Sequence, residues 1–135
     1  MKDTGLPESG PLPRPADLSE ARRVLRQEAI PAGNVQRVTL RAVEFTAICP
    51  RTGQPDFGTV TIDYAPRDQC MESKALKFYL WAYRDEGAFC EDLSARIADD
   101  VVSAIAPRGV RVTVHQAVRG GIEIVAVAER GAPPR

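Results

Sequence analysis

Residues 89–128, FCEDLSARIADDVVSAIAPRGVRVTVHQAVRGGIEIVAVA, decide the fold class of this chain. In the first half of this stretch apolar side chains recur at every fourth position, as on one face of a helix that ends before Pro107: Phe89, Leu93, Ile97, Val101 and Ile105. In the second half, residues 110–118 and 122–128 alternate in polarity around an Arg-Gly-Gly turn. This pattern predicts a helix followed by a β-hairpin.

A second hairpin and a second helix precede this stretch. Alternation from Val35 to Ile48 and again from Phe57 to Tyr64 predicts two strands, joined by a loop rich in Pro and Gly. Apolar residues at helical spacing between Met71 and Gly87 predict a helix. The order ββααββ predicts an α+β fold, with a four-stranded antiparallel sheet and two helices on one face. Such a sheet has two exposed edges, which favours a ring of subunits with active sites at their borders.

Length and composition limit the domain organisation and the partners. The 135 residues suffice for one domain, and we expect a single catalytic domain over residues 34–130 and a tail over 131–135. Residues 1–33, which begin with a Pro- and Gly-rich segment, are expected to form a flexible arm with a possible short helix over 18–29. The equal numbers of basic and acidic residues, 18 each, argue against nucleic acid as a direct partner.

The sequence offers no apolar run long enough to span a membrane. Several prolines interrupt residues 1–15, where a signal peptide would need an apolar stretch. Three cysteines without metal-site spacing, Cys49, Cys70 and Cys90, disfavour a disulfide framework. A cytoplasmic location is therefore expected. The single histidine, His115, argues against zinc sites built on several histidines, and we expect no metal. Enzyme chemistry would have to rest on Cys, carboxylates, Lys and Arg.

Cys49 and Asp56 begin and end the loop of the first hairpin. Because two strands close this loop, its ends approach each other, and the two residues could act as a thiol nucleophile and a carboxyl group that transfers protons. The alternative is a small apolar residue and an ordinary turn aspartate. Spacing alone leaves both interpretations open.

Three other groups of charged residues have both a structural and a functional interpretation. Lys74 and Lys77 follow Ser73 and share one helix face. They could bind a phosphate group, or they could only form a solvated surface. Glu91 begins the second helix, where it could bind a guanine-like base or only stabilise the positive end of the helix. Arg119 precedes two glycines. This run could be only a hairpin turn, or it could let the backbone and the arginine approach an anion closely.

Two longer motifs carry a family resemblance. The strings EFTAICPRTGQPDF at 44–57 and ESKALKFY at 72–79 resemble the short, single-module NADPH-dependent 7-cyano-7-deazaguanine reductases of queuosine biosynthesis, the QueF family. The similarity extends from about Val43 to Glu129. It implies the tunnelling fold, whose members assemble as homo-oligomeric rings with active sites between subunits.

The resemblance also implies roles for individual residues. Cys49 would add to the substrate nitrile to give a covalent thioimide, Asp56 would donate a proton, and two NADPH would deliver two hydrides. The residues expected to contact the deazaguanine substrate are Met71, Glu72, Ser73, Cys90 and Glu91. Lys74, Lys77 and Arg119 are the candidates for the NADPH phosphates.

One position departs from the family pattern. The family has a Phe-His-Glu string where this chain has Phe89-Cys90-Glu91, and His115 belongs to a different predicted strand. Cys90 could be a small apolar residue, or a thiol that forms a reversible disulfide with Cys49. Two other functions stay open: an amidinotransferase-type relative in which ammonia attacks the same thioimide, and a non-catalytic deazapurine-binding module.

Overall fold

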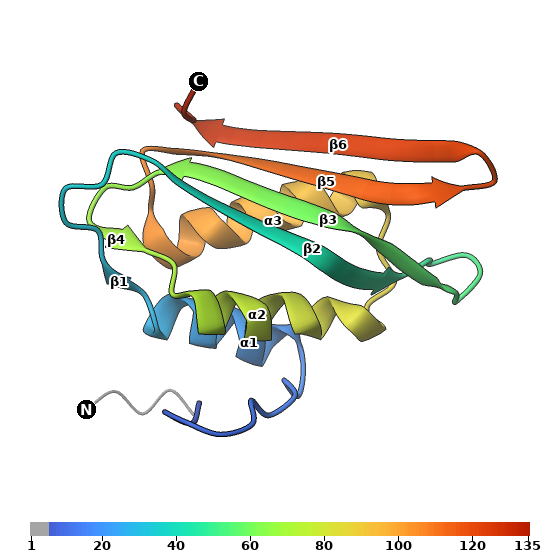
Figure 1. The fold of residues 1–135 in the computed structure, drawn as a ribbon, viewed down its shortest axis with the longest axis horizontal. Helices are drawn as coiled ribbons and strands as arrows, with labels where there is room; N and C mark the ends of the chain where they lie inside the picture. The colour runs from blue at the N-terminus through green and yellow to red at the C-terminus, as the bar shows by residue number, and fades with distance from the viewer. Residues whose placement is uncertain (1–5) are drawn as a thin grey trace.

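Four long strands form the antiparallel sheet that the sequence predicts. The computed structural model, which describes residues 6–135, places them in the order β2-β3-β5-β6, so that β2 and β6 form the edges (Figure 1). Each neighbouring pair is antiparallel. The bounds are Val38–Ile48 for β2, Pro55–Ala65 for β3, Gly109–Arg119 for β5 and Ile122–Gly131 for β6. The predicted α+β class is confirmed.

The helices cover one face of this sheet, and the two predicted ones are present. Helix α2 spans Ser73–Trp81 and continues as the short 3-10 helix η1, Ala82–Asp85, while α3 spans Cys90–Ile105 (Figure 1). The core between the layers is built from alternate residues of the two central strands and from the helices. The strand residues are Val60, Ile62, Tyr64, Val110, Val112 and Val114, all at most 2% exposed. No helix within residues 6–135 combines the length and the apolar character needed to cross a membrane.

A third helix, α1 over Leu18–Gln27, falls within the possible short helix expected over 18–29, but it packs against the core and is not a free arm. Asp17 caps this helix, and its Ala21, Val24 and Leu25 are fully buried against the rest of the core. The sequence placed this segment in a flexible arm because its apolar face is narrow and its other residues are charged. Packing against α2 and α3 nevertheless buries that narrow face completely. Residues 1–5 of the expected arm lie outside the described residues.

Polar contacts at the edge of the core join α1 to α3. Arg22 Nε donates to both carboxylate oxygens of Asp100 in α3, at 3.0 and 2.9 Å. Tyr79 of α2 donates to the same carboxylate and lies 2.8 Å from the Tyr83 hydroxyl. Burial raises the pKa of both tyrosines, that of Tyr83 to about 12, so both phenols stay protonated.

Two very short strands anchor the beginning of α2. The strands β1, Ile30–Pro31, and β4, Gln69–Cys70, pair antiparallel beside the main sheet. Directly after β4, the Met71 N–H donates to the Tyr64 hydroxyl at 3.0 Å. The sequence predicted neither strand, because two residues are too few to show alternation.

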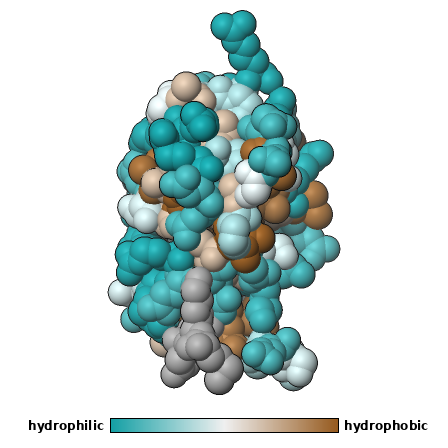
Figure 2. Space-filling model, turned by 90° about the vertical axis from the view of Figure 1, so that its left-hand side faces the viewer, coloured by the Kyte–Doolittle hydropathy of each residue, from teal (hydrophilic) through white to brown (hydrophobic). Residues whose placement is uncertain are grey.

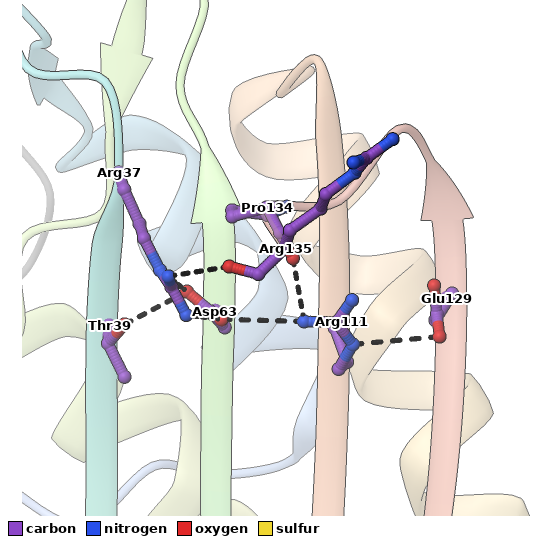
Figure 3. A network of polar contacts seen from close by, with 7 residues as sticks. All are labelled: Arg37, Thr39, Asp63, Arg111, Glu129, Pro134 and Arg135. Carbon is purple, nitrogen blue, oxygen red and sulfur yellow. Dashed lines mark hydrogen bonds and ion pairs between the residues drawn. The ribbon is translucent and has the colours of Figure 1, made fainter.

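A polar network on the helix-free face holds the C-terminal tail against the sheet (Figure 3). Arg37 of the segment before β2 donates to both carboxylate oxygens of Asp63 in β3, at 2.9 and 2.6 Å. Arg111 of β5 lies 3.5 Å from the same carboxylate and donates to the Pro134 carbonyl at 2.8 Å. The hydrogen bond from Arg37, followed by that from Thr39, keeps the pKa of Asp63 below its usual value.

Candidate active site

The loop between β2 and β3 holds the Cys49 thiol at the rim of the sheet. The Cys49 N–H donates to the Gln54 carbonyl and the Gly53 N–H donates to the Cys49 carbonyl, both at 2.9 Å. Gly53 has φ +72°, a backbone conformation that favours glycine, so the loop can close tightly around its own hydrogen bonds. The partly exposed thiol therefore has a fixed backbone beneath it.

The same loop makes this thiol acidic. The Thr52 hydroxyl, the backbone N–H groups of Thr52 and Arg51, and the charge of Arg119 all stabilise the thiolate. Together they lower the pKa of Cys49 from 9.0 to about 7. Because the thiolate is the nucleophilic form of cysteine, this lower pKa makes Cys49 more reactive at neutral pH than an ordinary cysteine.

Cys49 and Asp56 line one cavity of about 520 Å³. Asp56 is at the start of β3, where it pairs in register with Ala47. Its side chain is only 12% exposed and forms an ion pair with Arg119 at the end of β5. The predicted approach of thiol and carboxyl is thus confirmed as a shared cavity, and Arg119 and Glu91 line the same space.

Hydrogen bonds between β2 and the segment before α3 place Glu91 at this cavity. The Ile48 N–H donates to the Glu86 carbonyl, and the Ala88 N–H donates to the Ile48 carbonyl, both at 3.1 Å. They hold the first turn of α3 beside the residue that precedes Cys49. Glu91 is exposed there, at the positive end of the helix dipole.

Cys90 lies beneath the cavity with its thiol turned toward the core. It is 2% exposed, and its Sγ donates to the Val114 carbonyl at 3.5 Å. Burial, followed by the nearby charge of Glu91, raises the pKa of the Cys90 thiol. This geometry favours the interpretation of Cys90 as a small apolar residue.

His115 instead pairs with Glu123 on the exposed part of β5. Across residues 6–135, no three Cys, His, Asp or Glu side chains gather where they could hold a metal ion.

Met71, Glu72 and Ser73 do not reach this cavity in the same chain. They precede or begin α2 beside β4, at the opposite end of the molecule from the β2–β3 loop (Figure 1). Glu72 caps α2, since its carboxylate accepts the N–H groups of Lys74 and Ala75 at 2.8 and 2.9 Å. The β1–β4 side of the molecule carries mainly hydrophilic side chains with small separate apolar groups (Figure 2).

Lys77 lines a second cavity, of about 560 Å³, between α2 and the edge strand β2. Trp81 and Arg84 line it as well. Two cations and an indole fit the phosphates and a planar base of a dinucleotide such as NADPH. Sequence reasoning missed Trp81 and Arg84, although they follow Lys77 at four and seven positions on one helix face. Lys74 Nζ donates to the Pro7 carbonyl at 2.8 Å.

A four-stranded antiparallel sheet backed by helices, with an acidic thiol and two carboxylates in one cavity, defines an α+β protein with a cysteine-centred site. The family model of the QueF-like proteins matches residues 55–135, and the chain belongs to this family. The matched segment contains Asp56 and the motif at 72–79 and begins after Cys49.

Curated relatives and a solved structure agree with this family. The chain is 50% identical over 97 residues to the NADPH-dependent 7-cyano-7-deazaguanine reductase of Anaeromyxobacter sp. (strain Fw109-5), covering 72% of this chain and 80% of that protein. It is 53% identical over 93 residues to the enzyme of the same name from Nitrosomonas europaea, covering 69% and 67%. The crystal structure of the archaeosine synthase QueF-like in the apo form superposes with a TM-score of 0.69 at 28% identity, covering 75% of this chain and 99% of that one.

Proposed function

We propose that this protein is an NADPH-dependent 7-cyano-7-deazaguanine reductase, which converts the nitrile of its substrate to the primary amine of 7-aminomethyl-7-deazaguanine. The observation that carries the proposal is the Cys49 thiol, with a pKa of about 7, in one cavity with Asp56 and Glu91. The names of the curated relatives support it. The product would enter queuosine biosynthesis.

The first step would use Cys49 and Asp56. The Cys49 sulfur adds to the nitrile carbon and one π bond of the nitrile opens, while the Asp56 carboxylate takes the proton of the Cys49 thiol and passes it to the nitrile nitrogen. The resulting thioimide is a more electrophilic C=N than the nitrile was. NADPH, when bound, supplies one hydride to this carbon and a second NADPH supplies another. Between the two hydrides the nitrogen would take a second proton from solvent, the C–S bond would break to leave an iminium carbon that accepts the second hydride, and Cys49 would leave as the thiolate.

The binding residues would come from two subunits. Glu91 at the cavity mouth can accept two N–H groups of the purine-like ring, with Cys90 beneath it. Met71, Glu72 and Ser73 lie at the other end of the chain, so in a homo-oligomeric ring they would contact the substrate held by a neighbouring copy. Their separation from Cys49 supports a site shared between subunits.

The cofactor phosphates would lie along α2. Lys74 and Lys77 are the candidates from the sequence, and Arg84 and Trp81 extend the same face. Arg119, the third candidate, lies at the Cys49 cavity instead. A reducing compartment such as the cytoplasm suits an enzyme whose nucleophile must remain a free thiol.

Mass spectrometry in the absence of NADPH tests the proposal. Incubation with 7-cyano-7-deazaguanine should add the mass of the nitrile to the peptide that contains Cys49, and added NADPH should then be oxidised at two per nitrile. Cys49→Ala should lose both signals, while the matched variant Cys70→Ala should keep them. An adduct confined to the peptides of Cys70 or Cys90 would contradict the assignment.

A second candidate follows from the structural neighbour, whose description is archaeosine synthase. A protein of that kind would form the same Cys49 adduct, but ammonia would attack it to give an amidine. Product formation that requires ammonia and leaves NADPH unoxidised would favour this activity. Binding of the nitrile without adduct or turnover would indicate a non-catalytic deazapurine-binding module.

A further inference from the structure

Arg119 is bound on the Cys49 side of the molecule by two side chains. Its Nη1 forms an ion pair with Oδ1 of Asp56, and its Nη2 donates to Oε1 of Gln54 at 2.9 Å. Gln54 is also the residue whose carbonyl accepts the N–H of Cys49. One guanidinium therefore contacts both the carboxyl group and the loop that carries the nucleophile.

The local backbone directs Arg119 toward these partners. The register of the β5–β6 hairpin shifts between Gln116 and Arg119, and Arg119 pairs with Ile122 across the turn. Gly120 and Gly121 follow with φ +58° and +80°, which side chains rarely adopt. Such a bulge increases the twist of a strand and turns a side chain away from its regular direction.

The charges around the cavity make this contact specific. Among the described residues that line it, Asp56 and Glu91 are carboxylates, Cys49 and Cys90 are thiols, and Arg119 carries the one positive charge. Its guanidinium plane is already engaged by a carboxylate and an amide oxygen. Lys74 and Lys77, by contrast, lie on α2 and contact a carbonyl or line the other cavity.

We propose that Arg119 is a positioning residue for addition of Cys49 to the nitrile and is not a ligand of the cofactor. Its bidentate guanidinium holds the Asp56 carboxyl group and the 49–54 loop in one arrangement, so that sulfur and proton donor face the carbon and the nitrogen of the same nitrile. The proposal rests on the proposed function.

Three measurements on Arg119→Ala, Arg119→Lys and the wild type test it. Arg119→Ala should slow formation of the Cys49 adduct by roughly 10- to 100-fold, since small misplacements of reacting groups carry costs of that size. The pH midpoint of Cys49 alkylation should rise, because a nearby positive charge is lost. The dissociation constant for NADPH, followed by nicotinamide fluorescence, should stay within about twofold.

The lysine variant separates charge from geometry. Arg119→Lys should restore the alkylation midpoint but not the rate of adduct formation, because an ammonium group cannot hold Asp56 and Gln54 with a planar fork. The matched control is Arg26→Ala, which removes an equal charge at an exposed position of α1, outside the 49–54 loop and the residues that line the Cys49 cavity. This control should form the adduct at the wild-type rate.

Weakened NADPH binding with normal adduct formation in Arg119→Ala would overturn the proposal and return Arg119 to the cofactor. Full recovery of adduct formation in Arg119→Lys would overturn it too, because charge alone would then suffice. Failure of the proposed function looks different, since the wild type itself would then form no adduct with the nitrile.

Discussion

The lowered pKa of Cys49 comes mainly from the six-residue loop 49–54 and not from an imidazole. The Thr52 hydroxyl makes the largest contribution to the thiolate, and two backbone N–H groups of the loop follow. His115 is paired with Glu123 and does not line the Cys49 cavity. The loop therefore lowers the pKa of Cys49 in a chain that has Cys90 where the family pattern has histidine.

Replacing Thr52 should make Cys49 less reactive at neutral pH. A pKa below the usual value means that the thiolate forms at lower pH, so alkylation of Cys49 by iodoacetamide should rise through a midpoint at about pH 7. In Thr52→Val the midpoint should move toward 9.0. The neutral-pH rate should fall by about three- to tenfold.

Peptide mapping of the alkylated protein measures this, because burial protects Cys70 and Cys90. Thr59→Val, a threonine of β3 outside the loop, is the matched control and should keep the wild-type midpoint. An unchanged midpoint in Thr52→Val would show that another group sets the acidity of Cys49.

Helix α1 packs against the helices that cover the sheet and contributes to the hydrophobic core. Its Val24 and Leu25 are fully buried, and Arg22 reaches Asp100 of α3. Four other charged residues, Glu20, Arg23, Arg26 and Glu28, give the same segment a polar composition. An element of this kind contributes stability through a few fully buried side chains.

Leu25→Ala should lower the free energy of unfolding by about 3 kcal/mol, because a large apolar side chain is removed from a filled core. Urea denaturation of both proteins measures the difference. Arg26→Ala, at an exposed position of the same helix, should change stability by less than about 0.5 kcal/mol. Equal stabilities of Leu25→Ala and the wild type would mean that α1 is an independent arm in solution.

At the scale of the whole molecule, the residues expected to bind one substrate form two groups. Cys49, Asp56, Cys90 and Glu91 surround the cavity at one end, and Glu72 with its neighbours lies at the start of α2 at the other. A single chain does not bring these groups together. A second copy of the chain can, if its α2 lies against the Cys49 cavity.

Mixed oligomers should therefore regain activity. Cys49→Ala and Glu72→Gln should each be inactive alone, while subunits of the two variants, dissociated and reassembled at equal amounts, should show about a quarter of wild-type turnover. With random assembly, about a quarter of the subunit interfaces join a subunit with an intact Cys49 to a neighbour with an intact Glu72. Glutamine keeps an acceptor for the cap of α2, so the second variant should retain its fold.

Mixing Cys49→Ala with the double variant Cys49→Ala, Glu72→Gln is the control and should stay inactive. A mixture of the two single variants without activity would place the whole site within one chain.

The regular elements were predictable because their signals are local. Alternation fixes strand faces, fourfold spacing fixes the face of α3, and the Arg-Gly-Gly turn fixes the second hairpin. The strands β1 and β4 were not predictable in this way, because they have two residues each. For α1 the possible helix was predicted but its packing was not, because three fully buried residues are too few to outweigh its charges. The domain boundaries at 34 and 130 and the ring assembly stay predictions.

The sequence by itself determined the α+β fold, the order of its elements and the residues that could react, because periodicity and motif spacing are properties of neighbouring residues. Only the tertiary structure decided how those residues combine: Arg119 pairs with Asp56, Cys90 turns toward Val114, and Glu72, at the start of α2, does not line the Cys49 cavity. Such contacts join distant segments, and their geometry depends on how the sheet twists and how the helices pack against it.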